Sequence, residues 1–403
     1  MSSQIVVTIE MGTYRLSGVI MDCSRSKHKL LARAVAPSFG IKCGVIKNAR
    51  SFSKSIFQLI TKLENNSNQP IKKVNLSISG CSIRSFYVLR KFDLNSSSGE
   101  LTKEDIKFFT SECLQTFYMP DLEILEYYPI EFILDGRLVD KPIGMIGKEL
   151  MIRLHIIGCE KAALDNLVYN LSQSHLSIQK ILPSLLVSGY SFLSPEEMKN
   201  GTLIIDLGES TTTIGFFLDG NLIYIKSLDI GVSIITENIF NGLGMASLEE
   251  ARVLQTKHAE AADMSLTNGE ELIYINSDQA VTNKELSELV INGLDLIFRE
   301  VLNDIQENLI HSLIQRVYLI GGGANIMYIN QYVADITNLN VKEIHYDNKS
   351  ILREVPAQDV LAFLPHYGFV KYLTEHEKNS SLNSKGKSLN SFISKIFSIF
   401  GEN

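Results

Sequence analysis

The sequence predicts an α/β fold with two similar halves, and three segments predict it: two strand–turn–strand repeats and one glycine-rich turn. In the later repeat, an apolar run that ends in Asp206 precedes a turn at Gly208 and a second β-rich run from Ile214 to Leu218. Near the N-terminus, residues 5–20 repeat the order of apolar strand, acidic residue, Gly-Thr turn and strand. One such hairpin is weak evidence, but two copies indicate a duplicated unit.

The turn of each repeat carries residue types that suit phosphate binding. Gly208 permits a tight backbone turn, and the amides and hydroxyls from Ser210 to Thr213 can face an anion. Asp206 can hold a hydrated magnesium ion. The first repeat has Glu10 at the acidic position, followed by its own Gly-Thr turn. Two phosphate hairpins therefore predict a duplicated nucleotide clamp.

The glycine-rich turn is the third element. A strand over residues 317–320 runs directly into Gly321-Gly322-Gly323-Ala324-Asn325, and we expect a helix over residues 326–337. Three glycines after a strand allow the backbone to approach a flat ligand such as an adenosine closely. Each element alone also fits an ordinary hairpin or β–α turn, but their order along the chain favours a nucleotide site.

This order of motifs resembles the superfamily of actin, Hsp70 and sugar kinases, and the remaining chain resembles the FtsA family of bacterial cell-division proteins. The closer resemblance rests on residues 226–236, on Lys257-His258-Ala259 and on residues 319–324. It implies an actin-like ATPase fold, in which two duplicated α/β domains flank a nucleotide cleft. It also implies an inserted subdomain in the first half and a C-terminal amphipathic helix.

Composition and charge narrow the class of protein. The 403 residues are 45% hydrophobic and 21% charged, which suits a globular protein with several cores. A net charge of −7 without a basic stripe argues against a nucleic-acid partner. The five cysteines are widely spaced, so neither a zinc site nor a disulfide framework is indicated. We find no signal peptide and no apolar run near the roughly 18 residues of a membrane span, and expect a cytoplasmic body.

Changes of pattern along the chain predict the domain boundaries. Strands expected over 5–9, 14–22, 28–36 and 74–79, with a helix around 51–64, suit the first half of an actin-like domain. The expected units are the first part of domain 1 (1–83), an inserted subdomain (84–159), the rest of domain 1 (160–195), the first part of domain 2 (196–241), a helical upper subdomain (242–310), the end of domain 2 with a return to domain 1 (311–373), a flexible linker (374–388) and an amphipathic helix (389–403).

The expected insert combines strands with one helix that is capped at Thr102 and has Glu104 and Asp105 in its first turn. Its position in the chain resembles FtsA and differs from MreB-like actins. The resemblance implies that the insert contacts a neighbouring subunit or other division proteins, and a stable addition without a partner is the alternative. The resemblance also implies that residues 242–310 bind the tail of the tubulin homologue FtsZ.

The C-terminal region indicates a separate function. Residues 374–388 are polar and rich in Ser and Asn, as in flexible linkers. Beyond them, six large apolar side chains share one face of a helix, and at ~1.5–3 kcal/mol each they give roughly 10 kcal/mol of gross transfer free energy. Reversible binding to a membrane is expected, as for the anchor of FtsA; a helix that folds back on its own protein is the alternative. The six are Leu389, Phe392, Ile393, Ile396, Phe397 and Phe400.

Several residues near the expected nucleotide depart from the family pattern. Glu10 replaces an Asp, and its longer side chain is expected to carry the carboxylate further towards the phosphates or metal. Glu209 and Ser210 replace glycines, so that a negative charge at Glu209 is expected to weaken triphosphate binding unless the side chain turns away. Arg252 and Gln255 stand where the family tends to have Glu and Lys for the adenosine. Residues 366–368, His-Tyr-Gly, stand where it usually has smaller residues before Gly.

The resemblance implies ATP or ADP with Mg²⁺ as the cofactors. Asp206 is expected to hold Mg²⁺ through water, and Glu10 and Asp206 are the candidates for a hydrolytic role. We expect a nucleotide-binding scaffold with slow or absent hydrolysis. The expected nucleotide-binding residues are Gly12, Thr13, Tyr14, Arg15, Gly208, Ser210, Thr211, Thr212, Arg252, Gln255, Gly321, Gly322, Gly323 and Ala324.

The resemblance therefore implies a cell-division protein that binds ATP, self-assembles and anchors the FtsZ ring to the inner face of the cytoplasmic membrane. Such a protein is peripheral, acts at the division site in septum formation and helps to recruit later division proteins. Two alternatives stay open. A PilM-like platform of pilus assembly has a similar core but typically no amphipathic tail, and a sugar-kinase-type phosphotransferase needs a carboxylate base for which we find no convincing candidate.

Overall fold

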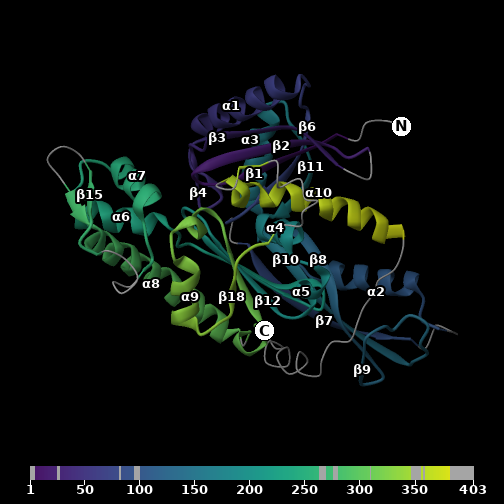
Figure 1. Ribbon diagram of the computed structural model, residues 1–403. Coiled ribbons are helices and arrows are strands. Elements are labelled where there is room, and N and C mark those ends of the chain that lie inside the picture. Colours follow the sequence, from purple (N-terminus) through teal and green to yellow (C-terminus); the bar gives the residue numbers. More distant parts are fainter. Residues whose placement is uncertain are drawn as a thin grey trace.

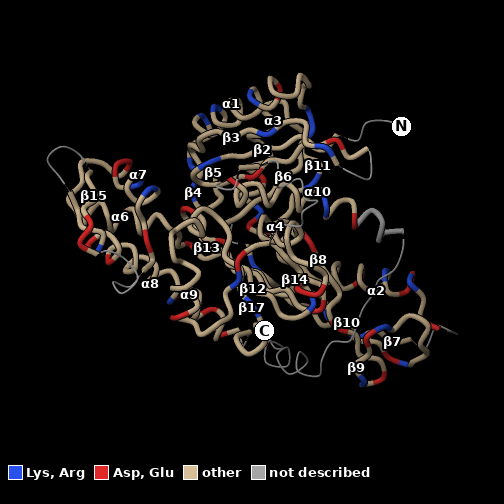
Figure 2. Tube along the Cα trace, viewed as in Figure 1, with Lys and Arg blue, Asp and Glu red and all other residues tan. Residues whose placement is uncertain are grey.

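The computed structural model describes residues 5–24, 28–80, 83–94, 100–262, 269–275, 280–308, 310–345, 355–356 and 359–381. The apolar residues expected to bind a membrane, from Leu389 to Phe400, lie outside these ranges. Figure 1 shows two α/β lobes, a helical unit beside the space between them, and a strand-rich extension at the opposite end. Acidic and basic residues are interspersed along both lobes (Figure 2). None of the described helices is long and apolar enough to span a membrane.

The first lobe is built on a five-stranded sheet in the order β11-β6-β1-β2-β3. The first three strands in the chain form an antiparallel meander, whereas β6 and β11 join it in parallel. Helices α1 and α3 lie on one side of this sheet, and α4 and α10 lie on the other (Figure 1). The bounds are β1 Ile5–Met11, β2 Arg15–Asp22, β3 Lys29–Pro37, β6 Lys73–Ile78, β11 Ser177–Pro183, α1 Ala49–Ser67, α3 Lys161–Gln173, α4 Ser184–Phe192 and α10 Val360–Ser381, with short strands β4 Ile41–Lys42 and β5 Val45–Ile46 beside the sheet.

The second lobe repeats this plan. Its strands β12, β13 and β14 form an antiparallel meander, and β17 pairs with β12 in parallel as β6 pairs with β1. Both predicted hairpins are therefore present, each beside a parallel strand, and the predicted duplication is confirmed. The bounds are α5 Pro195–Lys199, β12 Thr202–Leu207, β13 Thr212–Leu218, β14 Asn221–Leu228, β17 Arg316–Ile320, α9 Ile329–Thr337 and β18 Val341–Lys342.

The inserted unit extends the sheet of the second lobe, although the chain enters it from the first. The nine-stranded sheet runs β18-β17-β12-β13-β14-β7-β10-β8-β9, and the two parts join at one register pair, Lys226 opposite Arg84. Side chains of β7 continue this junction: the hydroxyl of Tyr87 donates to the carbonyl of Ile223 at 2.7 Å, and Ser85 exchanges hydrogen bonds with the backbone of Ile225. The bounds are β7 Arg84–Asp93, β8 Leu122–Leu134, β9 Arg137–Val139 and β10 Glu149–Glu160.

One helix of the insert, α2 (Lys103–Thr116), begins as its sequence predicts. The hydroxyl of Thr102 accepts from the amide of Asp105 at 3.1 Å, and the Asp105 carboxylate accepts from the amide of Thr102 at 2.8 Å. This reciprocal pair satisfies amides that the first helical turn leaves free. The helix covers a separate small core formed by Leu94, Leu101, Cys113, Leu134, Leu150, Ile152, Leu154 and Ile156.

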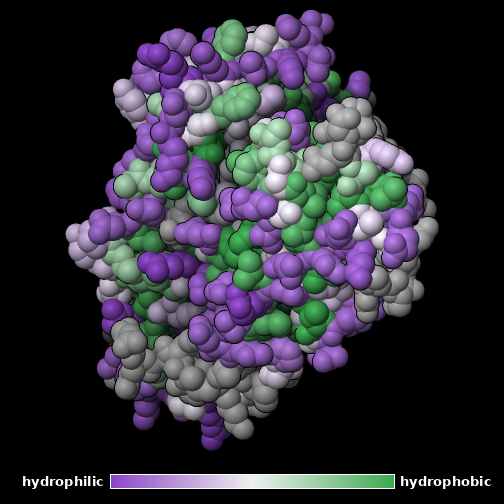
Figure 3. Space-filling model, turned by 90° about the vertical axis from the view of Figure 1, so that its left-hand side faces the viewer, coloured by the Kyte–Doolittle hydropathy of each residue, from purple (hydrophilic) through white to green (hydrophobic). Residues whose placement is uncertain are grey.

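In the described residues, the helical unit beside the cleft contains three helices and a two-stranded ribbon. Helix α6 packs against both α7 and α8, and the unit lies beside the first lobe in Figure 1. Figure 3 looks onto this side of the molecule, where hydrophobic areas lie between hydrophilic ones. Four large apolar side chains of α7 and β15 are exposed: Leu248, Val253, Leu272 and Tyr274. The bounds are α6 Ser233–Gly242, α7 Leu248–His258, β15 Leu272–Tyr274, β16 Ala280–Thr282 and α8 Asn283–Glu307.

Helix α10 closes the first lobe and packs along α4. The approach is close at Gly368, where a Cβ atom would lie 1.5 Å from the carbonyl oxygen of Val187, so only glycine fits. The preceding His366 is buried behind the first hairpin, where its ring nitrogens bond the hydroxyls of Thr8 at 2.8 Å and Ser17 at 2.9 Å. The helix continues to Ser381, so the first part of the stretch expected as linker is helical.

Candidate functional site

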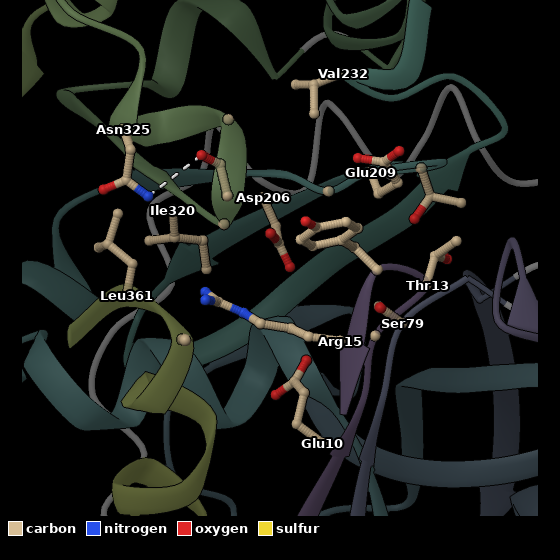
Figure 4. A pocket seen from close by; sticks show the side chains of 18 of the residues that line it. Glu10, Thr13, Arg15, Ser79, Asp206, Glu209, Val232, Ile320, Asn325 and Leu361 are labelled. Carbon is tan, nitrogen blue, oxygen red and sulfur yellow. Dashed lines mark hydrogen bonds between the residues drawn. The ribbon is translucent and has the colours of Figure 1, made fainter. Parts of the chain in front are cut away.

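A cavity of about 290 Å³ lies between the two lobes. Its walls come from both hairpin turns, the glycine-rich turn, α7 and the first part of α10 (Figure 4). Both acidic residues of the hairpins, Glu10 and Asp206, line it. Eleven of the expected nucleotide-binding residues line it as well: Gly12, Thr13, Tyr14, Arg15, Gly208, Thr211, Arg252, Gln255, Gly321, Gly322 and Gly323.

The other three expected residues do not line the cavity. The hydroxyl of Ser210 lies 2.7 Å from that of Thr13 and accepts from the amide of Cys43 at 3.0 Å, so it ties the second turn to the first lobe. Thr212 is buried in β13. Ala324 lies in the short 3₁₀ helix Gly322–Asn325.

The second turn is held by the start of α6. The amides of Val232 and Ser233 donate to the carbonyls of Gly208 and Glu209 at 2.9 and 2.8 Å. A Cβ atom at Gly231 would lie 2.6 Å from those two carbonyl oxygens and from the amide nitrogen of Thr211. Glycine at position 231 therefore lets the helix start press directly on the turn.

Asp206 is the next-to-last residue of β12 and lines the cavity. Burial raises its pKa to about 6. Gly321, at φ +84°, passes so close that a Cβ atom there would lie 2.3 Å from Oδ1 of Asp206. Among the described residues no hydrogen-bond donor engages this carboxylate, so its oxygens are available to a ligand, a water or a hydrated cation.

Glu10 occupies the matching place in the first hairpin but is held differently. Its carboxylate accepts hydrogen bonds from the hydroxyls of Ser184 at 2.9 Å and Ser77 at 3.2 Å. Burial, and then the charge of Asp206, raise the pKa of Glu10 to about 8, although the two serines and Arg15 oppose the shift. The two serines hold this carboxylate at the wall of the cavity, and the reach of its longer side chain towards phosphates or metal stays a prediction.

Arg15 supplies a cation inside the cavity. Figure 4 shows its side chain extending between Asp206 on one side and Glu10 on the other. Arg15 is one of the residues expected to bind the nucleotide, and it lines the cavity. A guanidinium here can pair with anionic oxygen atoms in a planar, bidentate manner.

Glu209 does not present a free charge to the cavity. Its Oε1 atom lies 2.5 Å from Nη2 of Arg252, which reaches it from α7. The two departures from the family pattern, noted separately in the sequence, therefore form one ion pair. Gln255, one turn further along α7, donates to the carbonyl of Val232 at 3.3 Å and accepts from the hydroxyl of Thr236.

The glycine-rich turn follows β17 as predicted, but the helix after it begins later. Residues Gly322–Asn325 form a 3₁₀ turn, and α9 begins at Ile329 instead of 326. Around Gly322 the Cβ direction is open, whereas a Cβ atom at Gly323 would lie 2.5 Å from a methyl group of Val232. The bare backbone at Gly322 leaves this wall of the cavity free for a flat ligand.

Some residues that line the cavity were not predicted from the sequence. Leu361, Ala362 and Pro365 come from α10, far away in the chain, and no local motif marks them. By contrast, Val232, Ala259 and Ile320 stand inside the segments that carry the resemblance, and Asn325 ends the glycine-rich turn, so these signals could have found them. The remaining lining residues that were missed are Ser17, Ser79, Ser188, Thr256 and Ile326.

Two family models match the chain. Residues 80–158 match the SHS2 domain inserted in FtsA, and residues 203–357 match the cell division protein FtsA. The chain belongs to the FtsA family. The first match coincides with the insert expected over residues 84–159, and FtsA is a family of cell-division proteins by name.

Curated relatives agree over most of the chain. The cell division protein FtsA of Borreliella burgdorferi is 26% identical, and the alignment covers 98% of this chain and 98% of that protein. FtsA of Bacillus subtilis is 25% identical over 85% of this chain and 78% of that protein.

Solved structures show the fold. A chain of the PilM–PilN type IV pilus biogenesis complex superposes with a TM-score of 0.62 at 13% identity, covering 90% of this chain and 95% of that one. MreB5 of Spiroplasma citri bound to ADP gives 0.55 at 12% identity, covering 94% and 99%. This FtsA-family chain therefore has the predicted actin-like fold, with its insert in the first half.

Proposed function

We propose that this protein binds ATP or ADP with Mg²⁺ in the cleft, self-assembles and links FtsZ polymers to the inner face of the cytoplasmic membrane at the division site. Membership of the FtsA family is the observation that carries the proposal. A PilM-like role in pilus assembly is the second candidate, since a PilM–PilN chain shares the fold.

The residues at the cleft support nucleotide binding. Actin-like MreB5 has been solved bound to ADP and to AMPPNP. In this chain Arg15 is placed to pair with phosphate oxygens, and the open backbone at Gly322 to approach an adenosine. The Asp206 carboxylate, without a donor among the described residues, fits a water of a hydrated Mg²⁺, which would offset phosphate charge when bound.

The state of Glu10 supports slow or absent hydrolysis. A general base must be ionised and within reach of the attacking water. With a pKa of about 8, Glu10 is mostly protonated at neutral pH, and its oxygens already accept from Ser77 and Ser184. Glu10 is therefore a poor base, and the protein acts as a nucleotide-dependent scaffold.

Three further surfaces support the proposed partners. The apolar side chains exposed on α7 and β15 offer a surface for the tail of FtsZ. The apolar face formed by Leu389 to Phe400 in the sequence offers the membrane contact. The insert, with its own core, projects away from the cleft and offers a separate surface to a neighbouring subunit or to later division proteins.

Co-sedimentation with anionic vesicles and FtsZ polymers tests the proposal. The full chain is compared with the double variant Phe392→Ser/Phe397→Ser and with a polar-face control, Ser391→Ala/Ser398→Ala, each with and without Mg-ATP. Burying two phenylalanines in the membrane would contribute roughly 3–6 kcal/mol of transfer free energy, so the double variant should stay in the supernatant.

We expect the wild type and the polar-face control to carry FtsZ to the vesicles. If the phenylalanine variant still sediments with vesicles, the anchor is wrong. If neither the wild type nor any variant binds vesicles or FtsZ, the result favours the PilM-like role.

A further inference from the structure

Arg252 is a charged residue of the cavity that contacts three other side chains. From α7 it reaches Glu209 at 2.5 Å and Glu249 at 3.3 Å. Its guanidinium carbon also lies 5.1 Å from the centre of the Tyr14 ring, which belongs to the opposite lobe. Arg252 therefore lies where the second turn, the helical unit and the first turn meet.

The Nε–H group of Arg252 is not satisfied by these contacts. It is buried, and no described residue accepts a hydrogen bond from it. A buried donor of a charged group without an acceptor is unfavourable, so an acceptor arriving in the cavity would be stabilised there. Since the group is cationic, an anionic oxygen is the acceptor that it would bind most strongly.

The position of Glu209 indicates that the anion bound by Arg252 would be a phosphate. Glu209 lies in the second turn, between Gly208 and Ser210, and both Gly208 and Thr211 line the cavity. A phosphate chain held by this turn would lie beside the carboxylate that now pairs with Arg252. Phosphate and Glu209 would then compete for one guanidinium, while repelling each other.

We propose that Arg252 directly binds the phosphate chain of a nucleoside di- or triphosphate, and that Glu209 competes for it and so limits the affinity. This inference rests on the proposed nucleotide-binding function. A guanidinium that only neutralises Glu209, without contacting the ligand, is the alternative that the experiment must separate.

Isothermal titration of the full-length protein with Mg-ATP, Mg-ADP and adenosine makes the separation. The variants are Glu209→Gln, Arg252→Gln and the double variant. We expect Glu209→Gln to bind ATP about tenfold more tightly, because a competitor and a repulsive charge are both removed. Arg252→Gln should bind about tenfold more weakly. Adenosine binding should change less than twofold in every variant, since it has no phosphate.

The double variant decides between the alternatives. If Arg252 contacts phosphate, adding Arg252→Gln to Glu209→Gln should still weaken ATP binding about tenfold. If the double variant binds as tightly as Glu209→Gln alone, Arg252 only neutralises Glu209 and the inference is overturned. If wild type and Glu209→Gln both fail to bind any nucleotide, the proposed function itself fails.

Two controls guard against trivial results. Glu249→Gln removes the exposed partner of Arg252 and should leave ATP affinity within about twofold. Arg252→Lys keeps the charge but loses the planar fork, so its affinity should lie between wild type and Arg252→Gln, including in a case where the Gln variant folds poorly. Thermal unfolding of each variant verifies that a change in affinity is measured on folded protein.

Discussion

The two hairpins of this molecule share one backbone plan but use their acidic residues in opposite ways. In the first, Glu10 is turned to the serines of β6 and α4, and His366 lies behind the strands against Thr8 and Ser17. In the second, Asp206 faces the cavity without a donor among the described residues, and the turn rests on the start of α6. In the duplicated motif, one acidic residue is thus held by its own lobe and the other faces the cavity.

This difference concerns charge as well as geometry. Burial raises the pKa of both carboxyl groups, to about 8 for Glu10 and about 6 for Asp206. At neutral pH, Asp206 is therefore mostly ionised and Glu10 mostly neutral. Of the two hairpin carboxyl groups, only that of Asp206 is then mostly negative, which limits the repulsion of an anionic ligand.

The largest expected effect comes from disturbing the contact between the start of α6 and the second turn. Replacing Gly231 by Val would place side-chain atoms against the carbonyls of Gly208 and Glu209, because a Cβ atom already lies 2.6 Å from them. We expect a loss of about 3 kcal/mol in the free energy of unfolding, together with loss of nucleotide binding. Denaturant unfolding and ATP titration measure the two effects.

Gly322→Ala is the matched control for this substitution. No atom lies within 4 Å of a Cβ built at Gly322, and its stability should change by less than about 1 kcal/mol. Equal losses for both variants would show that the helix start does not support the turn.

The protonation of Glu10 provides the second test. The folded-state pKa of about 8 lies above the ordinary value of 4.5, so the folded protein binds the additional proton between these values. The contribution of Glu10 to the free energy of unfolding should therefore be fully present below pH 4.5 and be lost as the pH rises towards 8. Glu10→Gln resembles the protonated form at every pH, and at pH 8.5 it should exceed the wild type by roughly 2–4 kcal/mol.

Denaturant unfolding of both proteins at pH 5 and pH 8.5 measures this effect. Parallel pH dependence of the two proteins would contradict a neutral Glu10. Asp206→Asn is an informative control: since the charge of Asp206 contributes to the raised pKa of Glu10, this variant should narrow the window over which stability is lost.

The smallest expected effect concerns the direct contact between the hairpins. Thr13→Val removes the hydroxyl that lies 2.7 Å from Ser210, at nearly constant volume, and should cost about 0.5–1 kcal/mol. Ser210→Ala removes that contact and also the acceptor for the amide of Cys43, so it should cost about 1–2 kcal/mol. Thermal unfolding measures both, and a larger loss for Thr13→Val would reverse the assigned order.

Features set by local sequence were predictable. The turns at Gly12 and Gly208, the glycine-rich turn and the cap at Thr102 are each determined by a few neighbouring residues, and all are found in the structure. Pairings between distant residues were not predictable in this way. Arg252 is 43 residues from Glu209, and Ser184 is 174 residues from Glu10. Only the folding of the chain brings these side chains together. Once paired, Glu209 and Glu10 are no longer the free carboxylates that their positions in the sequence suggest.

The continuous sheet has a mechanical consequence. In the sequence, the insert is connected at both ends to the first lobe. Its strand β7 is nevertheless paired with β14 of the second lobe, through Arg84 opposite Lys226 and the hydrogen bonds of Ser85 and Tyr87. The insert thus forms a strut that connects the lobes on a path separate from the cleft. A rotation that opens the cleft must therefore break this short junction between β7 and β14 or move the whole insert with the second lobe. A partner that grips the insert would therefore restrain the cleft without touching it.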